Sequence, residues 1–345
     1  MKLLILTQKI DEQDPILGFF VRWVQEFAKH CEKVTVICLY EGKHSLPGNV
    51  SVLSLGKEKR SSRIKYLWRF YRYIWNERKN YDCVFVHMNP IYIVLGGIFW
   101  RAFGKKISLW YTHKTVDAKL RIAEKLSHII FTASEKSFRL PSGKIQVVGH
   151  GIDTAAFLSD MARSAKKKDD KDDLSILSIG RISPVKNYEI LIRALGTLRR
   201  RGILARVRIV GPADTKKEKK YLAFLHALAE GEGVRESVSF EREVPPASVS
   251  ALLREADVFV NVSKTGSLDK AILEAVAAGV PVVTSNEAFA GILPEEFLCG
   301  KSPDDLARRI PLAAKKGLPR EVRDYVVRHH DTMSLIPRLV SILSS

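Results

Sequence analysis

The sequence has few cysteines and no long apolar run, and both absences exclude classes of protein. Its four cysteines form no C-x-x-C pair and have no zinc-ligand spacing with histidine, which argues against a disulfide framework or a structural zinc site. The nearest approach to a membrane-spanning segment, YIVLGGIFW at 92–100, is far too short. The short apolar run that opens the chain leads into polar residues, so it predicts a first strand rather than a signal peptide. We therefore expect a cytoplasmic protein with reduced cysteines, some of them in its cores.

Two further absences concern ligands. No predicted strand is followed by G-x-G-x-x-G, which disfavours a nicotinamide-dependent oxidoreductase. Acidic residues are scarce, with 38 Asp and Glu against 56 Lys and Arg, and the formal net charge is +18. This excess suits nucleic acid, an anionic membrane surface or phosphorylated small molecules as partners. No zinc, homeodomain, RRM or KH signature accompanies it, so nucleic acid is not the expected partner, although a basic nucleic-acid-binding protein stays an alternative.

Strand-like apolar runs alternate with amphipathic helical stretches along the chain. The predicted strands are 2–7, 33–39, 83–87, 107–112, 128–133 and 144–148, then 175–180, 206–211, 237–240, 258–262 and 281–285. The predicted helices include 19–30, 188–200, 216–230 and 246–255. This order predicts an α/β protein with parallel sheets and helices on both faces. We expect two doubly wound, Rossmann-like domains, with a ligand cleft between the carboxyl ends of their sheets.

A charged run, SDMARSAKKKDDKDD at 159–173, divides the two sets of strands. It has almost no apolar residues and is typical of a solvated linker. We therefore expect a first domain over 1–158, a linker over 159–173 and a second domain over 174–320. The remaining segment, 321–345, is predicted to be helical.

The stretch LSILSIGRISPVKNYEILIRAL at 174–195 places cations where a ligand is expected. The apolar run ends at Gly180, which allows a sharp turn and a close approach to a ligand. Arg181 and Lys186 follow before a helical pattern begins at Tyr188. Two cations on a short loop at the carboxyl end of a strand suit a diphosphate, with Arg forked onto the oxygens and Lys as a point charge.

A second stretch, ADVFVNVSKTGSLDKAILEAVAAGVPVVTSN at 256–286, has the same plan. A strand leads into a small polar loop at 263–267, and a helix follows with Ser267 or Asp269 as its cap. The N-terminus of this helix should present free backbone N–H groups and the positive end of the helix dipole to the cleft. Glu274 has apolar neighbours within the helix, which argues against a fully solvated position.

Together these stretches resemble the retaining GT-B glycosyltransferases of group 1, family 4 of the sequence classification. The resemblance is strongest in SIGRISPVKNYEILIRAL, RVRIVGP, READVFVNVS and LEAVAAGVPVVTSN, and weaker in VVGHGIDTAAF and LWYTHKT. It implies an acceptor-side first domain, a nucleotide-sugar-binding second domain and a C-terminal helix that crosses back to the first. It also implies transfer with retained anomeric configuration, without a metal or a cofactor.

Carried over to this chain, the resemblance implies site residues. Arg181 and Lys186 would bind the donor diphosphate and stabilise the leaving nucleotide, and His113 would reach the transferred sugar. Glu274 would hold the ribose hydroxyls. The other implied donor-binding positions are Gly180, Glu243, Val244, Ser267, Leu268, Asp269 and Lys270, and Gly18 would match the glycine of the loop after the first strand.

One departure from the family pattern concerns the sugar. The family's E-x7-E motif places its first Glu at 266, where this chain has Gly266. That carboxylate normally serves the sugar's hydroxyls, so we hypothesise that Asp269 replaces it.

The sequence therefore predicts a hexosyltransferase that uses a nucleotide-sugar donor and a lipid-linked or glycan acceptor, in cell-envelope glycan or glycolipid assembly. A GT-B protein that binds nucleotide but has lost catalysis is the main alternative, prompted by Gly266.

The segment 56–80 concentrates the positive charge, with nine Lys or Arg against two Glu. Ile64, Leu67, Tyr71 and Ile74 recur at three- and four-residue spacing beside two tryptophans. Aromatic residues flanked by cations suit the headgroup layer of an anionic bilayer. A helix packed on the first domain with a solvated basic face is the alternative, and both can hold together. We expect peripheral docking on the inner face of the membrane.

Overall fold

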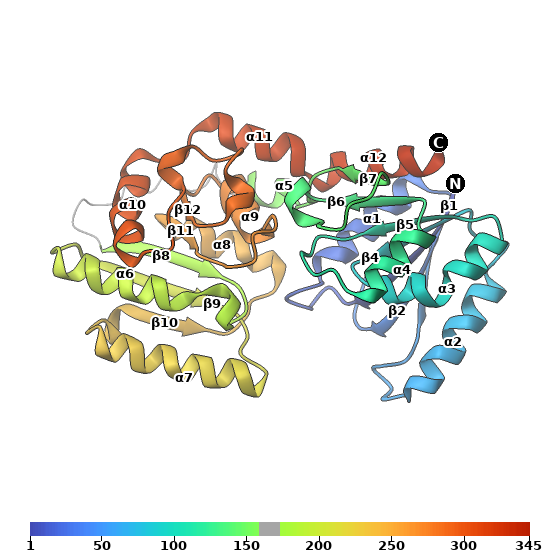
Figure 1. Ribbon diagram of the computed structural model, residues 1–345, viewed down its shortest axis with the longest axis horizontal. Coiled ribbons are helices and arrows are strands. Elements are labelled where there is room, and N and C mark those ends of the chain that lie inside the picture. The colour runs from blue at the N-terminus through green and yellow to red at the C-terminus, as the bar shows by residue number, and fades with distance from the viewer. Residues whose placement is uncertain (159–172) are drawn as a thin grey trace. The chain divides into compact units, whose positions relative to one another are not determined.

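The structure, a computed structural model, describes residues 1–158 and 173–345 (Figure 1). The chain divides into two compact units, Met1–Gly151 with His329–Ser345, and Ile152–Arg328. Except for Asp173, the predicted linker 159–173 lies outside the described residues.

The first unit is built on a seven-stranded sheet in the order β3-β2-β1-β4-β5-β6-β7, with every pair of neighbours parallel. Its strands are β1 (Lys2–Ile10), β2 (Lys33–Glu41), β3 (Val50–Ser54), β4 (Cys83–His87), β5 (Lys106–Trp110), β6 (Ile129–Thr132) and β7 (Ile145–Val147). Its helices are α1 (Phe19–His30), α2 (Arg63–Asn76), α3 (Pro90–Ala102), α4 (Ala118–Leu126) and α12 (Thr332–Ser344).

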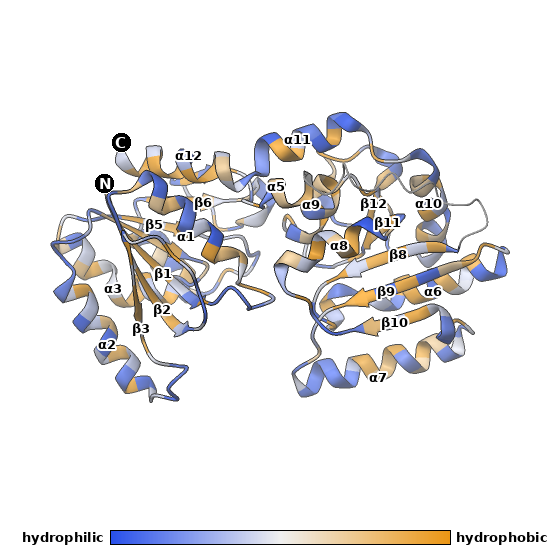
Figure 2. Ribbon diagram, turned by 180° about the vertical axis from the view of Figure 1, so that it is seen from behind, coloured by the Kyte–Doolittle hydropathy of each residue, from blue (hydrophilic) through white to orange (hydrophobic). Residues whose placement is uncertain are grey.

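Two apolar clusters cover the two faces of this sheet, because successive residues of a strand point to opposite sides. Leu3 and Ile5 of β1 pack with residues of α1 and α12, whereas Leu4 and Leu6 pack with residues of α2, α3 and α4. The strands at the centre of the sheet are therefore apolar almost throughout, as Figure 2 shows.

The second unit is built on a five-stranded parallel sheet in the order β10-β9-β8-β11-β12. Its strands are β8 (Leu174–Ile179), β9 (Ala205–Val210), β10 (Val238–Glu241), β11 (Val258–Asn261) and β12 (Val282–Thr284). Its helices are α5 (Thr154–Leu158), α6 (Tyr188–Arg200), α7 (Lys216–Gly231), α8 (Val249–Arg254), α9 (Lys270–Ala277), α10 (Pro303–Lys316) and most of α11 (Arg320–His330).

The predicted α/β class with doubly wound parallel sheets is confirmed, and most predicted strands are found within one to three residues. The strand β3 was not predicted. None of its five residues is fully buried, so it lacks the apolar run by which the other strands are found. The predicted helix 246–255 is a 3₁₀ turn, Pro246–Ser248, followed by α8.

The boundaries of the units correct the predicted domain limits of 158 and 320. The first unit ends at Gly151, whose carbonyl accepts a hydrogen bond from Trp23 Nε1 of α1, and α5 already packs on α9. The chain returns to the first unit at His329. The C-terminal segment forms two helices, because Asp331 accepts a hydrogen bond from the Met333 amide and caps α12.

All four cysteines are free, as predicted. Cys31, Cys38 and Cys83 are buried, and Cys299 is half-buried. Burial raises the pKa of the Cys31 thiol to about 11, so these thiols are poor nucleophiles near neutral pH.

Candidate functional site

The candidate site lies in the second unit, where the strand order reverses between β8 and β11. In open parallel sheets, ligands bind outside the carboxyl ends of the strands at such a reversal. The loop after β8 (180–187) and the loop after β11 (262–269) both start there. A backbone hydrogen bond joins the two loops, since the Lys264 amide donates to the Val185 carbonyl at 2.9 Å.

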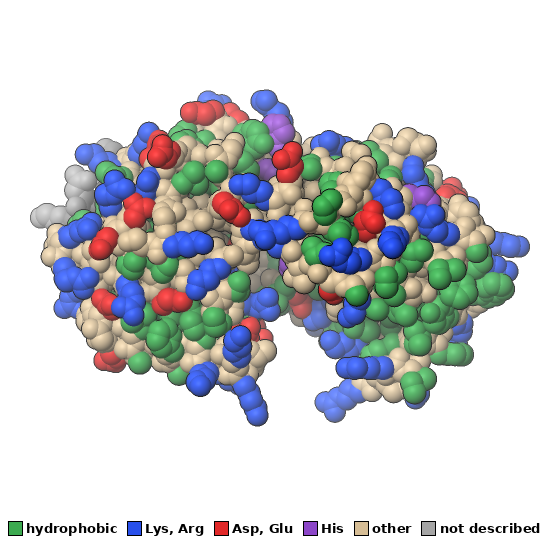
Figure 3. All heavy atoms as spheres, viewed as in Figure 1, with side chains coloured by type: hydrophobic (Ala, Val, Ile, Leu, Met, Phe, Trp, Pro, Cys, Tyr) green, Lys and Arg blue, Asp and Glu red, His purple; other side chains and the backbone are tan. Residues whose placement is uncertain are grey.

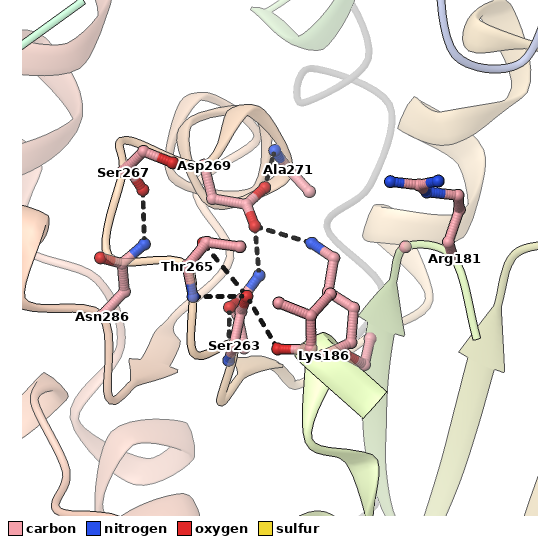
Figure 4. Close-up of polar contacts among 12 residues, drawn as sticks. Arg181, Lys186, Ser263, Thr265, Ser267, Asp269, Ala271 and Asn286 are labelled. Atoms are coloured by element: carbon pink, nitrogen blue, oxygen red, sulfur yellow. Dashed lines mark hydrogen bonds and ion pairs between the residues drawn. The ribbon is translucent and has the colours of Figure 1, made fainter. Parts of the chain in front are cut away.

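An ion pair between Lys186 and Asp269 links the two loops. Lys186 Nζ lies 2.8 Å from Asp269 Oδ2, and their side chains are only 17% and 13% exposed. The same carboxylate oxygen accepts a hydrogen bond from Asn261 Nδ2 at 3.0 Å, and Oδ1 accepts from the Ala271 amide. Figure 4 shows this carboxylate at the centre of the polar contacts.

Burial opposes the negative charge of Asp269, but the Lys186 ammonium and the hydrogen bonds outweigh burial. The pKa of this carboxyl is therefore lowered from its ordinary value. Asp269 also resolves the capping alternatives. It is the cap of α9, and Ser267 is not.

Gly180 makes room for Lys186. A Cβ at position 180 would lie 2.7 Å from Lys186 Cε, and the backbone there has φ +152°. The Gly180 carbonyl accepts a hydrogen bond from the buried Tyr188 hydroxyl at 2.8 Å. The prediction was that a ligand approaches this glycine closely. In the structure the Lys186 side chain of the same loop lies there, on its way to Asp269.

The loop after β11 is held by buried polar side chains. Asn261 Oδ1 accepts from the Ser263 amide, and Asn286 Nδ2 donates to the Ser267 carbonyl at 2.8 Å. Gly266, where the family pattern has Glu, has φ +58°. A residue with a side chain is strained in this left-handed conformation, so the glycine suits the local backbone as well as removing a carboxylate.

Arg181 is exposed at the end of β8 (Figure 4). Among the described residues, no ion pair of its guanidinium is found. The pKa of Glu218, in the first turn of α7, is lowered chiefly by hydrogen bonds to Thr215 and further by the charge of Arg181. The predicted pair of cations therefore divides in two: Lys186 is neutralised by Asp269, and Arg181 faces solvent.

Glu274 lies on α9, one turn after Lys270. Its carboxylate is 2.7 Å from Lys270 Nζ, and its side chain is only 13% exposed. The expectation that this carboxylate is not fully solvated is confirmed. Leu268, between the loop and the helix, is buried.

Glu243 and Val244 follow β10 at the edge of the sheet, and both are half-buried. The backbone of 242–245 lies outside helices and strands. The predicted contact of this backbone with the nucleotide base stays a prediction.

His113 and Gly18 lie in the first unit. His113 is exposed, three residues beyond the end of β5, where the prediction had extended the strand to 112. Its ring makes an edge contact with Tyr111 at 5.8 Å. Gly18 precedes α1, and a Cβ there would lie 2.5 Å from the Asp14 carbonyl oxygen, so only glycine fits this turn.

His87 is one of two buried histidines of the first unit, the other being His330. His87 stacks on Phe20 at 4.1 Å, and its Nδ1 lies 3.4 Å from Thr7 Oγ1. Burial, together with His150 and His113, lowers its pKa to about 3. It is a neutral ring of the core, which agrees with the structural role that is commonest for an isolated histidine.

Two residues of the site, Asn261 and Asn286, were not predicted. Each interrupts or directly follows an apolar strand, in VFVNVS and VVTSN, and that polar position was the available signal. Within 1–158 and 173–345, no three His, Cys, Asp or Glu side chains are grouped to hold a metal ion. None of the helices in these ranges has the length and apolar character needed to cross a membrane.

Comparison with known proteins identifies a matching family and several relatives. Residues 160–322 match the family described as glycosyl transferases group 1. The GDP-mannose-dependent alpha-(1-6)-phosphatidylinositol monomannoside mannosyltransferase of Mycolicibacterium smegmatis is 34% identical over 172 residues, 47% of this chain and 43% of that protein. The putative colanic acid biosynthesis glycosyltransferase WcaL of Salmonella typhimurium is 30% identical over 207 residues, 58% of this chain and 47% of that protein. The match thus spans less than half the length of either relative.

Solved structures resemble the whole chain. Anabaena Alr3699/HepE in complex with UDP superposes with a TM-score of 0.76 at 18% identity, with 100% of both chains covered. Sucrose-phosphate synthase from Thermosynechococcus elongatus gives 0.73 at 13% identity, with 99% of this chain and 98% of that chain covered. At these identities the likeness shows the fold, and the predicted two-domain GT-B fold is confirmed.

Proposed function

We propose that this chain, whose residues 160–322 match the group 1 glycosyl transferases, transfers a hexosyl group from a nucleotide-sugar to a glycan or lipid-linked acceptor. The observation that carries the proposal is the pair of loops at the strand reversal of the second unit. These loops hold Lys186 in a largely buried ion pair and leave Arg181, earlier in the same loop, exposed.

The chemistry requires positive charge at the leaving group. When the bond between the sugar's anomeric carbon and the diphosphate oxygen breaks, negative charge grows on the nucleoside diphosphate and the sugar becomes oxocarbenium-like. Arg181 offers a forked donor, and Lys186 a point charge already fixed in place. Preorganised donors of this kind contribute about 3 kcal/mol each to transition-state stabilisation.

Asp269 serves this site by positioning Lys186. Both of its carboxylate oxygens accept hydrogen bonds within the protein, so the sugar would have to compete for them. We assign Asp269 first as the partner that orients the ammonium. Its hypothesised second role, replacing the missing carboxylate at 266, stays a prediction for an Asp269→Asn variant assayed with different sugars.

The remaining donor contacts are proposed from the family resemblance. Glu274, beside Lys270, would hold the ribose hydroxyls, and Glu243 and Val244 would meet the base through their backbone. His113 would reach the transferred sugar. We propose retention of configuration and no metal requirement, which product analysis by NMR and an assay in the presence of a chelator would test.

The named relatives support the acceptor class. One acts on a phosphatidylinositol mannoside, and the other is assigned to colanic acid synthesis. The first name denotes a glycolipid and the second a glycan, so we propose an acceptor of one of these kinds, in cell-envelope assembly. The donor base is open, because one relative is GDP-mannose-dependent and HepE was crystallised with UDP.

A ligand panel tests the donor site. UDP, GDP, ADP, dTDP, NAD and a short RNA are compared by thermal shift on the wild type, on Arg181→Ala/Lys186→Ala, and on Lys217→Ala/Lys220→Ala. The last variant is the matched control, since both lysines are exposed on α7. A ligand at 100 times its Kd stabilises by about 2.7 kcal/mol.

We expect one nucleoside diphosphate to stabilise the wild type and the control but not the double variant. Stabilisation by RNA alone would overturn the proposal. A third outcome is stabilisation by a nucleoside diphosphate without transfer from any matching nucleotide-sugar. It would favour the alternative prompted by Gly266, a protein that binds nucleotide but has lost catalysis.

A further inference from the structure

We propose that the first unit docks on an anionic lipid bilayer through an aromatic face formed by α2 and α3. The face consists of Ile64, Leu67, Trp68 and Trp75 of α2 and Ile98 and Phe99 of α3, and we call it the α2–α3 face. This goes beyond the donor site, since it concerns another unit and needs no sugar transfer.

The helix α2 has two apolar stripes. Phe70 and Ile74 are buried against the sheet, which accounts for the packing of the helix. Ile64, Trp68 and Trp75 recur at spacings of four and seven on another side and are 80%, 59% and 54% exposed. A helix that only packs on its domain needs one stripe, so the second one faces a partner.

The end of α3 extends this apolar surface. Ile98 is 69% exposed, and the Phe99 ring lies 5.4 Å from that of Tyr71 of α2. A hollow of about 230 Å³ opens between the two helices, lined by Tyr71, Ile74, Trp75, Phe99 and Phe103. Figure 3 shows hydrophobic side chains gathered over α2 and α3 with basic ones around them. The lining of this hollow is almost wholly apolar, so the hollow suits an acyl chain.

The positive charges around the α2–α3 face indicate that its partner is an anionic bilayer. Arg63, Lys65 and Arg72 are exposed, and among the described residues none of them forms an ion pair. The Arg72 and Arg78 guanidinium groups lie over the rings of Trp68 and Trp75, at 4.5 and 4.3 Å from their centroids. Cations beside interfacial aromatic rings are what the headgroup layer favours.

The acidic side chains of the segment do not offset these cations. Glu58 accepts hydrogen bonds from Ser54 Oγ, and Glu77 faces Lys33 and Asn80. A second copy of the chain, docked face to face, would bring like charges together. Charge complementarity therefore favours lipid phosphate over self-association.

Vesicle sedimentation tests the proposal. The wild type should bind vesicles of phosphatidylcholine with phosphatidylglycerol, bind pure phosphatidylcholine vesicles far less, and dissociate at high salt. Replacing Arg63, Lys65 and Arg72 by Gln should weaken binding about fivefold per charge, and on the order of 100-fold together. The control, with Lys216, Lys217 and Lys219 of α7 replaced by Gln, removes equal charge and should bind as the wild type.

Tryptophan fluorescence supplies a second readout. Of the five tryptophans, Trp23, Trp100 and Trp110 are buried, so a blue shift on adding vesicles must come from Trp68 and Trp75. Trp68→Phe/Trp75→Phe should bind vesicles without the shift, and Trp68→Ser/Trp75→Ser should lose binding while keeping the wild-type Tm.

Several results would overturn the proposal: equal binding to neutral and anionic vesicles, no vesicle binding, or equal weakening in the α7 control. A blue shift that grows with protein concentration without vesicles would assign the face to a second copy instead. None of these readouts involves a nucleotide, so the donor-site proposal can survive their failure.

Discussion

Removing either partner of the Lys186–Asp269 ion pair should destabilise the second unit more than removing both. The two variants to compare are Lys186→Met and Asp269→Asn. Each removes one charge and keeps most of the side-chain volume. Asp269→Asn also keeps an oxygen for the Ala271 amide, so the cap of α9 is affected little.

The magnitude follows from burial and contacts. With side chains 17% and 13% exposed, the pair is mostly but not wholly withdrawn from water. Leaving one charge of a fully buried pair without its partner costs about 3–5 kcal/mol, and the residual exposure places this pair at the low end, about 3 kcal/mol. Replacing both charges leaves no buried ion, so the double variant should lose only about 1 kcal/mol.

The assay is thermal unfolding of the full chain near neutral pH, followed by a probe that reports the second unit. For a domain of this size, 1 kcal/mol corresponds to about 2–4 °C in Tm, so each single variant should fall by about 6–12 °C. The coupling in the double-mutant cycle should be several kcal/mol. Single variants within 1 °C of the wild type, or strictly additive effects, would refute the reasoning and show that water already screens this pair.

Two further predictions concern Gly266 in the second unit and His87 in the first. Gly266→Glu, which restores the family's carboxylate, should destabilise the protein by about 1–2 kcal/mol, because position 266 has φ +58°. Thermal unfolding measures this loss, and donor affinity is measured beside it. A variant as stable as the wild type, with tighter donor binding, would contradict the prediction and show that the loop adapts. His87 has a pKa lowered from 6.5 to about 3, so its neutral form stabilises the fold fully above pH 6.5, and this contribution is lost as pH falls toward 3. The free energy of unfolding should therefore depend less on pH in that window for His87→Gln, and parallel curves for the variant and the wild type would contradict the assignment.

Much of the fold followed from local patterns. The central strands are buried on both faces, so they stand out as apolar runs, and helices such as α1 and α6 were predicted with the bounds that the structure has. The exposed edge strand β3 and the short helix α5 were beyond this reasoning. In β3 serines interrupt the apolar residues, and α5 has only five residues, too few for a helical period to show. The unit to which α5 belongs is decided by its packing on α9.

The same division holds for the candidate site. The sequence alone determined which residue types end the strands of the second unit, and it singled out Gly180, Lys186 and Asp269, because strand ends in parallel sheets face ligands. Only the tertiary structure decided that these three meet, since Lys186 and Asp269 are 83 residues apart and are joined by the neighbouring positions of β8 and β11. It likewise decided that Asn261 shares the carboxylate and that one side of α2 stays exposed. Contacts between distant segments depend on sheet order and packing, which no local pattern encodes.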